Sequence, residues 1–164
     1  MTSGTPDIAL RRHVRQLLTE RQAHLMFDDV VEDFPLTRMN ERVDGLPYSA
    51  FEVLWHLRFT QRNILEFVQD APYQKVEWPQ GYWPHRQDAT DAEWHAEVAA
   101  FREDQAALLR LLDDPQTDLF AVVPNGRPPE GEGQTWLREF LLVADHNAYH
   151  LGELLVLRRL LGGA

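Results

Sequence analysis

The chain has 164 residues, of which 44% are hydrophobic, and it contains no cysteine. This length supports one domain with a sizeable core, and the lack of cysteine excludes disulfides, thiolate metal sites and a cysteine nucleophile. The formal net charge of −10, from 16 basic and 26 acidic residues, argues against nucleic-acid partners, which are usually met with a basic face.

The sequence has no segment typical of a signal peptide or a transmembrane helix. The first residues, MTSGTPDIALRRH, lack an apolar run, and no later segment supplies about 18 uncharged apolar residues in succession. We therefore expect a cytoplasmic protein without a membrane partner.

The first predicted helix runs from about Pro6 to Phe34. Proline suits the first turn of a helix, and Pro35 is a natural stop. Apolar residues recur along this segment on one stripe: Leu10, Val14, Leu17, Leu18, Leu25 and Val30. We expect one long amphipathic helix here.

The second predicted helix follows a capping box. Ser49 and Glu52 form the S-x-x-E pattern that marks a helix start, and the helix is expected to continue to about Gln69. One face of this helix is apolar and carries Val53, Leu57, Ile64 and Val68. This face is expected to point into the core.

Two further helices are predicted, each after a long connection. Thr90 and Glu93 repeat the capping pattern ahead of a third helix that Pro115 limits, and a fourth helix runs from about Thr135 to Leu161. The connections, roughly residues 70 to 90 and 114 to 134, are rich in proline, glycine and aromatic residues. They exceed the roughly two to eight residues of ordinary helix connections, so they are crossovers or functional covers. An all-α, single-domain four-helix bundle accounts for residues 1–164.

The fourth helix contains HNAYH, which places His146 and His150 one turn apart. Both can face the bundle interior, as can His56 in the second helix. Three imidazoles with one open coordination position describe a catalytic metal site better than a structural one. The alternative is that each is a core histidine hydrogen-bonded to a neighbour, and spacing alone does not decide between these two interpretations.

Two carboxylates lie near these histidines along their helices. Glu52 and Glu153 are candidate general bases or partners of a metal ligand. The simpler interpretations are a helix-capping carboxylate for Glu52 and a solvated helix charge for Glu153.

Three aromatic residues in the first long connection are candidates for substrate binding. Trp78, Tyr82 and Trp83 could form a lid over the open metal position, because amphipathic rings suit the wall of a small-molecule pocket. Alternatively, they only anchor the connection to the bundle.

The segments AFEVLWHLRFTQRNILEF and LLVADHNAYHLGELLVLRRLLG resemble the DinB-like (DinB/YfiT) family, whose members are regarded as metalloenzymes. GYWP and TDLFAVVPNG extend the resemblance over essentially the full chain. Its specific part is one histidine in the second helix and H-x-x-x-H in the fourth. The resemblance implies an up-down-down-up bundle, with residues 70 to 90 as the crossover, and places the three-histidine metal site on His56, His146 and His150.

The family resemblance also implies a class of reactions. Assigned members include transferases that use low-molecular-weight thiols such as bacillithiol or mycothiol, and members commonly form homodimers. We expect a divalent-metal-binding protein, with zinc or nickel favoured. Its predicted activity on a small-molecule substrate is thiol S-transfer, with the thiol as cosubstrate, or hydrolysis. The alternatives are a noncatalytic metal-binding stress-response bundle and a helical scaffold with core histidines and no ion.

Overall fold

The computed structural model describes residues 4–86 and 88–163. Within them it contains five α-helices and three short 3-10 helices, and its only β-structure is an isolated bridge between Val122 and Thr135. The predicted all-α class is confirmed. The α-helices are α1 (Gly4–Thr19), α2 (Phe27–Val31), α3 (Ala50–Val68), α4 (Asp91–Asp113) and α5 (Trp136–Leu160). The 3-10 helices are η1 (Leu36–Arg38), η2 (Gln80–Tyr82) and η3 (Pro124–Gly126).

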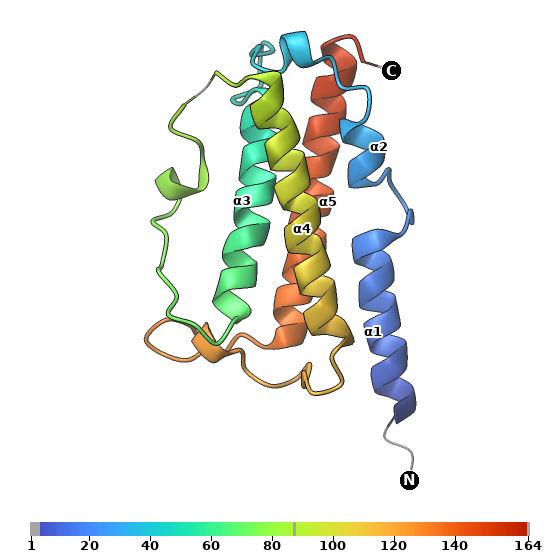
Figure 1. Cartoon of the computed structure of the whole chain (residues 1–164), viewed down its shortest axis with the longest axis vertical. Coiled ribbons are helices and arrows are strands. Elements are labelled where there is room, and N and C mark those ends of the chain that lie inside the picture. Colours follow the sequence, from blue (N-terminus) through green and yellow to red (C-terminus); the bar gives the residue numbers. More distant parts are fainter. Residues whose placement is uncertain (1–3, 87, 164) are drawn as a thin grey trace.

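The four long helices lie lengthwise beside one another (Figure 1). α3 packs against both α4 and α5, and α1 lies against the same two helices. In the view of Figure 1, α1 and α5 run upward, whereas α3 and α4 both run downward. The connection between α3 and α4 therefore climbs the whole length of α3 on its outer side, where it can reach side chains along that helix.

The predicted capping boxes start α3 and α4. The Glu52 backbone N–H donates to the Ser49 hydroxyl over 3.3 Å, and the Ser49 backbone N–H donates to the Glu52 carboxylate over 2.8 Å. Thr90 and Glu93 make the same reciprocal pair. Each box satisfies backbone donors that the first turn of a helix leaves free. The box of α3 sets where the helix begins, and therefore which face carries its later residues.

The expected single helix from Pro6 to Phe34 is wrong, because α1 ends at Thr19 and the separate α2 begins only at Phe27. Residues 19–24 read TERQAH, with alanine as the only apolar residue. A helix continued through them would bury almost nothing to offset the entropy of ordering it. The predicted apolar stripe crosses residues 19–24, which contribute no residue to either core cluster.

Contacts with α4 and α5 fix the short helix α2. The Phe27 ring stacks on the Phe101 ring of α4 with centroids 3.8 Å apart. Arg158 of α5 donates to the backbone carbonyls of Asp29 (2.5 Å) and Val30 (3.2 Å). A five-residue helix leaves most of its carbonyls without a helical partner, and a buried guanidinium supplies one.

The core is divided into two apolar clusters with a polar layer between them. One cluster contains α3 residues up to Leu57 and α5 residues from Leu151 onward. The other contains α3 residues from Ile64 onward and α5 residues up to Val143. Five polar side chains of α3 and α5, which we call the polar layer, lie at the boundary between the two clusters: His56, Gln61, His146, Asn147 and His150.

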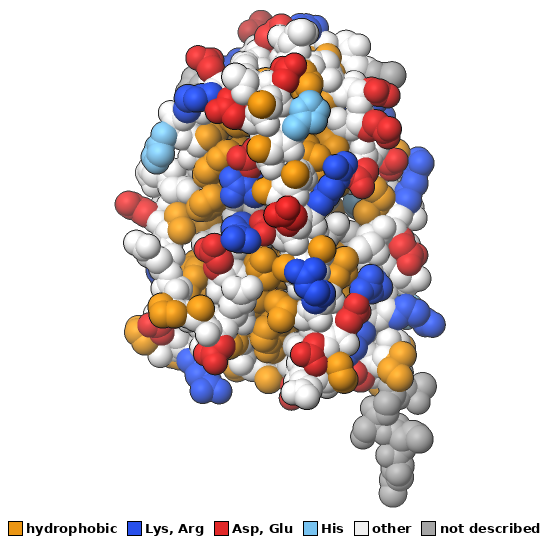
Figure 2. Space-filling model, in the orientation of Figure 1, with side chains coloured by type: hydrophobic (Ala, Val, Ile, Leu, Met, Phe, Trp, Pro, Cys, Tyr) orange, Lys and Arg blue, Asp and Glu red, His pale blue; other side chains and the backbone are white. Residues whose placement is uncertain are grey.

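The surface carries charges of both signs. Acidic and basic side chains are interspersed over the face shown in Figure 2. In the described part of the chain, no helix is both long and apolar enough to cross a membrane.

We expect Phe27→Ala to lower the free energy of unfolding by about 3 kcal/mol, because it removes a buried ring stacked on α4. Urea denaturation followed by circular dichroism measures this change. Phe120→Ala is the matched control, since Phe120 is 68% exposed, and it should change stability by less than about 0.5 kcal/mol. Equal urea midpoints for the two variants would show that α2 is not part of the core.

Candidate metal centre

Three imidazoles meet where α3 faces α5. His56 comes from α3, and His146 and His150 come from successive turns of α5. The Nε2 atom of His56 lies 3.1 Å from Nε2 of His150 and 3.2 Å from Nε2 of His146. The three candidate ligand atoms all lie within 4.8 Å of one another. The predicted convergence of these histidines is therefore observed, and the other four histidines, His13, His24, His85 and His95, are exposed.

The outer nitrogens of two of these rings have acceptors. His56 Nδ1–H donates to the backbone carbonyl of Tyr82 over 2.7 Å, and His150 Nδ1–H donates to the carboxylate of Glu153 over 2.7 Å. A carbonyl and a carboxylate accept hydrogen bonds, so they place the proton on Nδ1. In a neutral ring the Nε2 atom then carries a lone pair. Both rings therefore turn a lone pair toward the interior of the cluster.

Burial keeps the rings neutral. It lowers the pKa of His146 to about 3, with further lowering by His150 and His56, and it lowers the pKa of His150 to about 4, with a contribution from His56. Burial also lowers the pKa of His56, against the opposing effect of the Tyr82 carbonyl. At neutral pH the contact of His150 with Glu153 is thus a hydrogen bond from a neutral ring.

This donor set fits a divalent cation. Two lone pairs 3.1 Å apart have no hydrogen between them to share, and a buried contact of this kind is unfavourable unless a cation lies between the atoms. Two nitrogens bound tetrahedrally to one zinc ion at about 2.0–2.1 Å lie about 3.3–3.4 Å apart. The separations of His56 Nε2 from the other two Nε2 atoms, 3.1 and 3.2 Å, are close to that value. A carboxylate or carbonyl on the outer nitrogen is also the usual arrangement around a metal-bound histidine.

Aromatic rings cover the His56 side of the cluster. Trp83 stacks on His56 with centroids 4.1 Å apart, and Tyr48 stacks on the other side of Trp83 at 3.5 Å. The Tyr82 hydroxyl donates to Asn63 over 2.8 Å, and burial raises the pKa of Tyr82 to about 12. Tyr82 and Trp83 thus both contact the cluster or its supports. Trp78 differs, because it is 69% exposed and touches Tyr82 edge-on.

The two candidate carboxylates differ in whether they contact the histidine cluster. Glu153 contacts His150 directly, where it orients the ring. Glu52 is buried, but its oxygens accept from the Ser49 backbone and from Arg42. It is not among the residues whose ligand atoms converge. The structure brings Glu153 to the cluster and leaves Glu52 in the helix cap.

Sequence reasoning missed several supports of the cluster. Gln61 is fully buried and links three helices, accepting from Asn147 of α5 over 2.9 Å and donating to the Phe101 carbonyl of α4 over 2.8 Å. The Tyr82 carbonyl and the Tyr48 ring were also missed. A backbone acceptor leaves no signature in side-chain patterns, whereas a glutamine in the middle of an apolar helix face was a signal that could have been used.

Comparison with known proteins identifies one family. The family model described as the DinB superfamily matches residues 8–154, which includes all three histidines. Searches of the curated proteins and of the solved structures gave no match.

We expect Trp83→Ala to lower the free energy of unfolding of the metal-free protein by about 2 kcal/mol, because it removes a ring stacked between Tyr48 and His56. Trp78→Ala, in the same connection, should cost less than about 0.5 kcal/mol. Chemical denaturation in the presence of chelator measures both. A larger loss for Trp78→Ala would mean that the wrong ring has been identified as the anchor.

Proposed function

The chain belongs to the DinB superfamily, and on that premise we propose that His56, His146 and His150 together bind one divalent metal ion. Zinc and nickel are the favoured ions, because both accept imidazole ligands. The observation that carries the proposal is the convergence of three Nε2 atoms, two of them turned inward by acceptors on Nδ1. The helix directions in Figure 1 agree with an up-down-down-up four-helix bundle around this site.

We further propose that the protein is a metal-dependent enzyme acting on small molecules. Three protein ligands leave at least one coordination position for water or a substrate atom, as in catalytic rather than structural sites. When bound, the metal would make a coordinated water or thiol more acidic and so supply a nucleophile near neutral pH. Glu153 holds the His150 ring in place. Trp83 excludes water from one face of His56.

The proposed reaction is thiol S-transfer or the corresponding hydrolysis. The chain has no cysteine, so a thiol must enter as a low-molecular-weight cosubstrate. Its sulfur forms a bond to an electrophilic carbon, the bond from that carbon to the leaving group breaks, and the leaving group departs with the electron pair. The thiol proton passes to solvent. In hydrolysis, water takes the place of the thiol.

Metal content tests the first step. After supplementation with zinc or nickel, wild-type protein should retain about one ion per chain. Removing even an outer partner of a ligand costs about 10- to 100-fold in affinity, so His56→Ala, His146→Ala and His150→Ala should each lose at least that much. His95→Ala, at an exposed histidine, is the control and should retain the metal. Unchanged metal content in all three site variants would refute the proposal.

An activity assay separates the enzyme from a noncatalytic bundle. Metal-loaded protein is mixed with a low-molecular-weight thiol and a panel of electrophiles, and with activated esters for hydrolysis. We expect turnover that chelator abolishes and that His95→Ala leaves unchanged. A large rise in melting temperature on metal binding, with no turnover on any compound, would instead support a noncatalytic metal-binding protein.

A further inference from the structure

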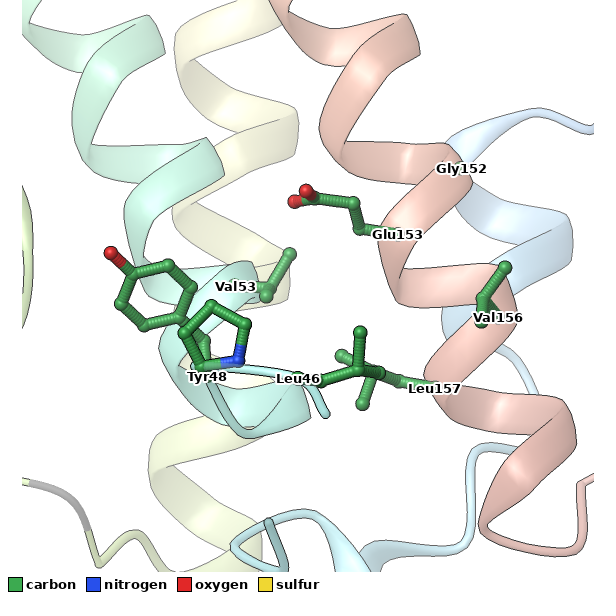
Figure 3. Close-up of a pocket in the computed structure, with 8 residues that line it drawn as sticks. Leu46, Tyr48, Val53, Gly152, Glu153, Val156 and Leu157 are labelled. Atoms are coloured by element: carbon green, nitrogen blue, oxygen red, sulfur yellow. The ribbon is translucent and has the colours of Figure 1, made fainter. Parts of the chain in front are cut away.

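A pocket of about 330 Å³ opens between the start of α3 and the last turns of α5 (Figure 3). Its walls are mainly apolar and include Leu46, Pro47, Val53, Val156 and Leu157. Among the described residues that line it, only Glu153 carries a charged side chain, and Figure 3 shows this carboxylate reaching from α5 toward α3. The volume is at the lower end of the range of small-molecule pockets, about 300–1,000 Å³.

Two side chains of the pocket wall connect to the candidate metal centre, one directly and one through Trp83. The Glu153 carboxylate accepts from His150 Nδ1 over 2.7 Å. The Tyr48 ring lies on Trp83, which in turn lies on His56. A molecule in the pocket would therefore touch the direct partner of one candidate ligand and the ring stack that covers another. The pocket is therefore linked to the centre from α5 through Glu153, and from the segment before α3 through Tyr48 and Trp83.

Gly152 leaves the wall of this pocket open. It lies inside α5, where glycine is unfavourable relative to alanine. A Cβ atom added to Gly152 would meet no other atom within 4 Å, so close packing does not require glycine at this position. Its backbone is helical, so conformational freedom does not require it either. What glycine does here is to leave space beside Glu153.

We propose that this pocket binds the apolar part of the small-molecule substrate, an aromatic or aliphatic group, and that Gly152 determines how large that group is. This inference rests on the proposed function, because the pocket would hold the bound group beside a metal centre that His150 helps to form. A carboxylate on an otherwise apolar wall suits a ligand that also carries a hydrogen-bond donor, such as a hydroxyl group.

A small molecule is favoured over a second copy of the chain by the shape and position of the site. The site is a concavity with a mainly apolar wall, and the one carboxylate in that wall, Glu153, is the hydrogen-bond partner of His150. Leu46 and Val156 are 37% and 46% exposed, so a protein partner seated on the pocket would have to cover both. Binding of a second copy of the chain at this pocket is one of the outcomes that the following test distinguishes.

The test is calorimetric titration of metal-loaded protein with 2-naphthol, which combines an apolar bicycle with one hydroxyl donor. Gly152→Leu fills the pocket, and Ala106→Leu adds the same side chain at an exposed position of α4. We expect wild type and Ala106→Leu to bind 2-naphthol equally, and Gly152→Leu to bind it at least tenfold more weakly. Metal content and helical circular dichroism should be equal in all three proteins.

Each contrary result has a distinct meaning. Equal 2-naphthol affinity in wild type and Gly152→Leu, or no binding to either, would overturn the pocket proposal even if the metal is retained. If Gly152→Leu instead changes the oligomeric state in light scattering while wild type binds no 2-naphthol, the pocket is an interface between copies of the chain. If wild-type protein binds 2-naphthol but no metal, the proposed function fails and the pocket is a small-molecule site unconnected with metal chemistry.

Discussion

The inward-facing lone pairs of buried neutral imidazoles are the constraint on which the rest of the structure depends. His56 and His150 each have a hydrogen-bond acceptor on Nδ1, so their Nε2 atoms are left to face one another at 3.1 Å. Burial disfavours protonation of either ring. A cation between the rings would remove this conflict. The amide nitrogens of Gln61 and Asn147 donate elsewhere, to the Phe101 carbonyl and to the Gln61 side-chain oxygen.

The topology of the chain and the support of this cluster are linked. Because α3 and α4 run in the same direction, the connection between them passes along α3 (Figure 1). That connection brings the Tyr82 carbonyl to His56 Nδ1 and the Trp83 ring to the face of His56. Gln61 ties the layer to α4 through the Phe101 carbonyl. A short hairpin connection between α3 and α4 would not run along α3 and could not supply these two contacts with His56.

The parts of the molecule that could be predicted from sequence are those set by local patterns. The capping boxes at Ser49 and Thr90 and the i, i+4 spacing of His146 and His150 depend on neighbouring residues alone, and the structure agrees with them. The break after Thr19 was missed because Phe27 and Val30 are held by Phe101 and Arg158, which are distant in sequence. The pocket beside Glu153 was missed for the same reason, since its walls come from three separate segments. Gly152 is visible in the sequence as a glycine inside a strongly helical segment, but its role depends on the residues on the other side of the pocket.

The most direct test of the account is a crystal structure of the zinc-loaded protein with anomalous diffraction recorded on both sides of the zinc absorption edge. We predict one strong anomalous peak at the cluster, bonded to Nε2 of His56, His146 and His150 at about 2.0–2.1 Å, with a non-protein ligand in the remaining position. The Tyr82 carbonyl and Glu153 should keep their contacts with the two Nδ1 atoms. A peak at other residues, or a cluster without zinc when the ion is in excess, would contradict the account.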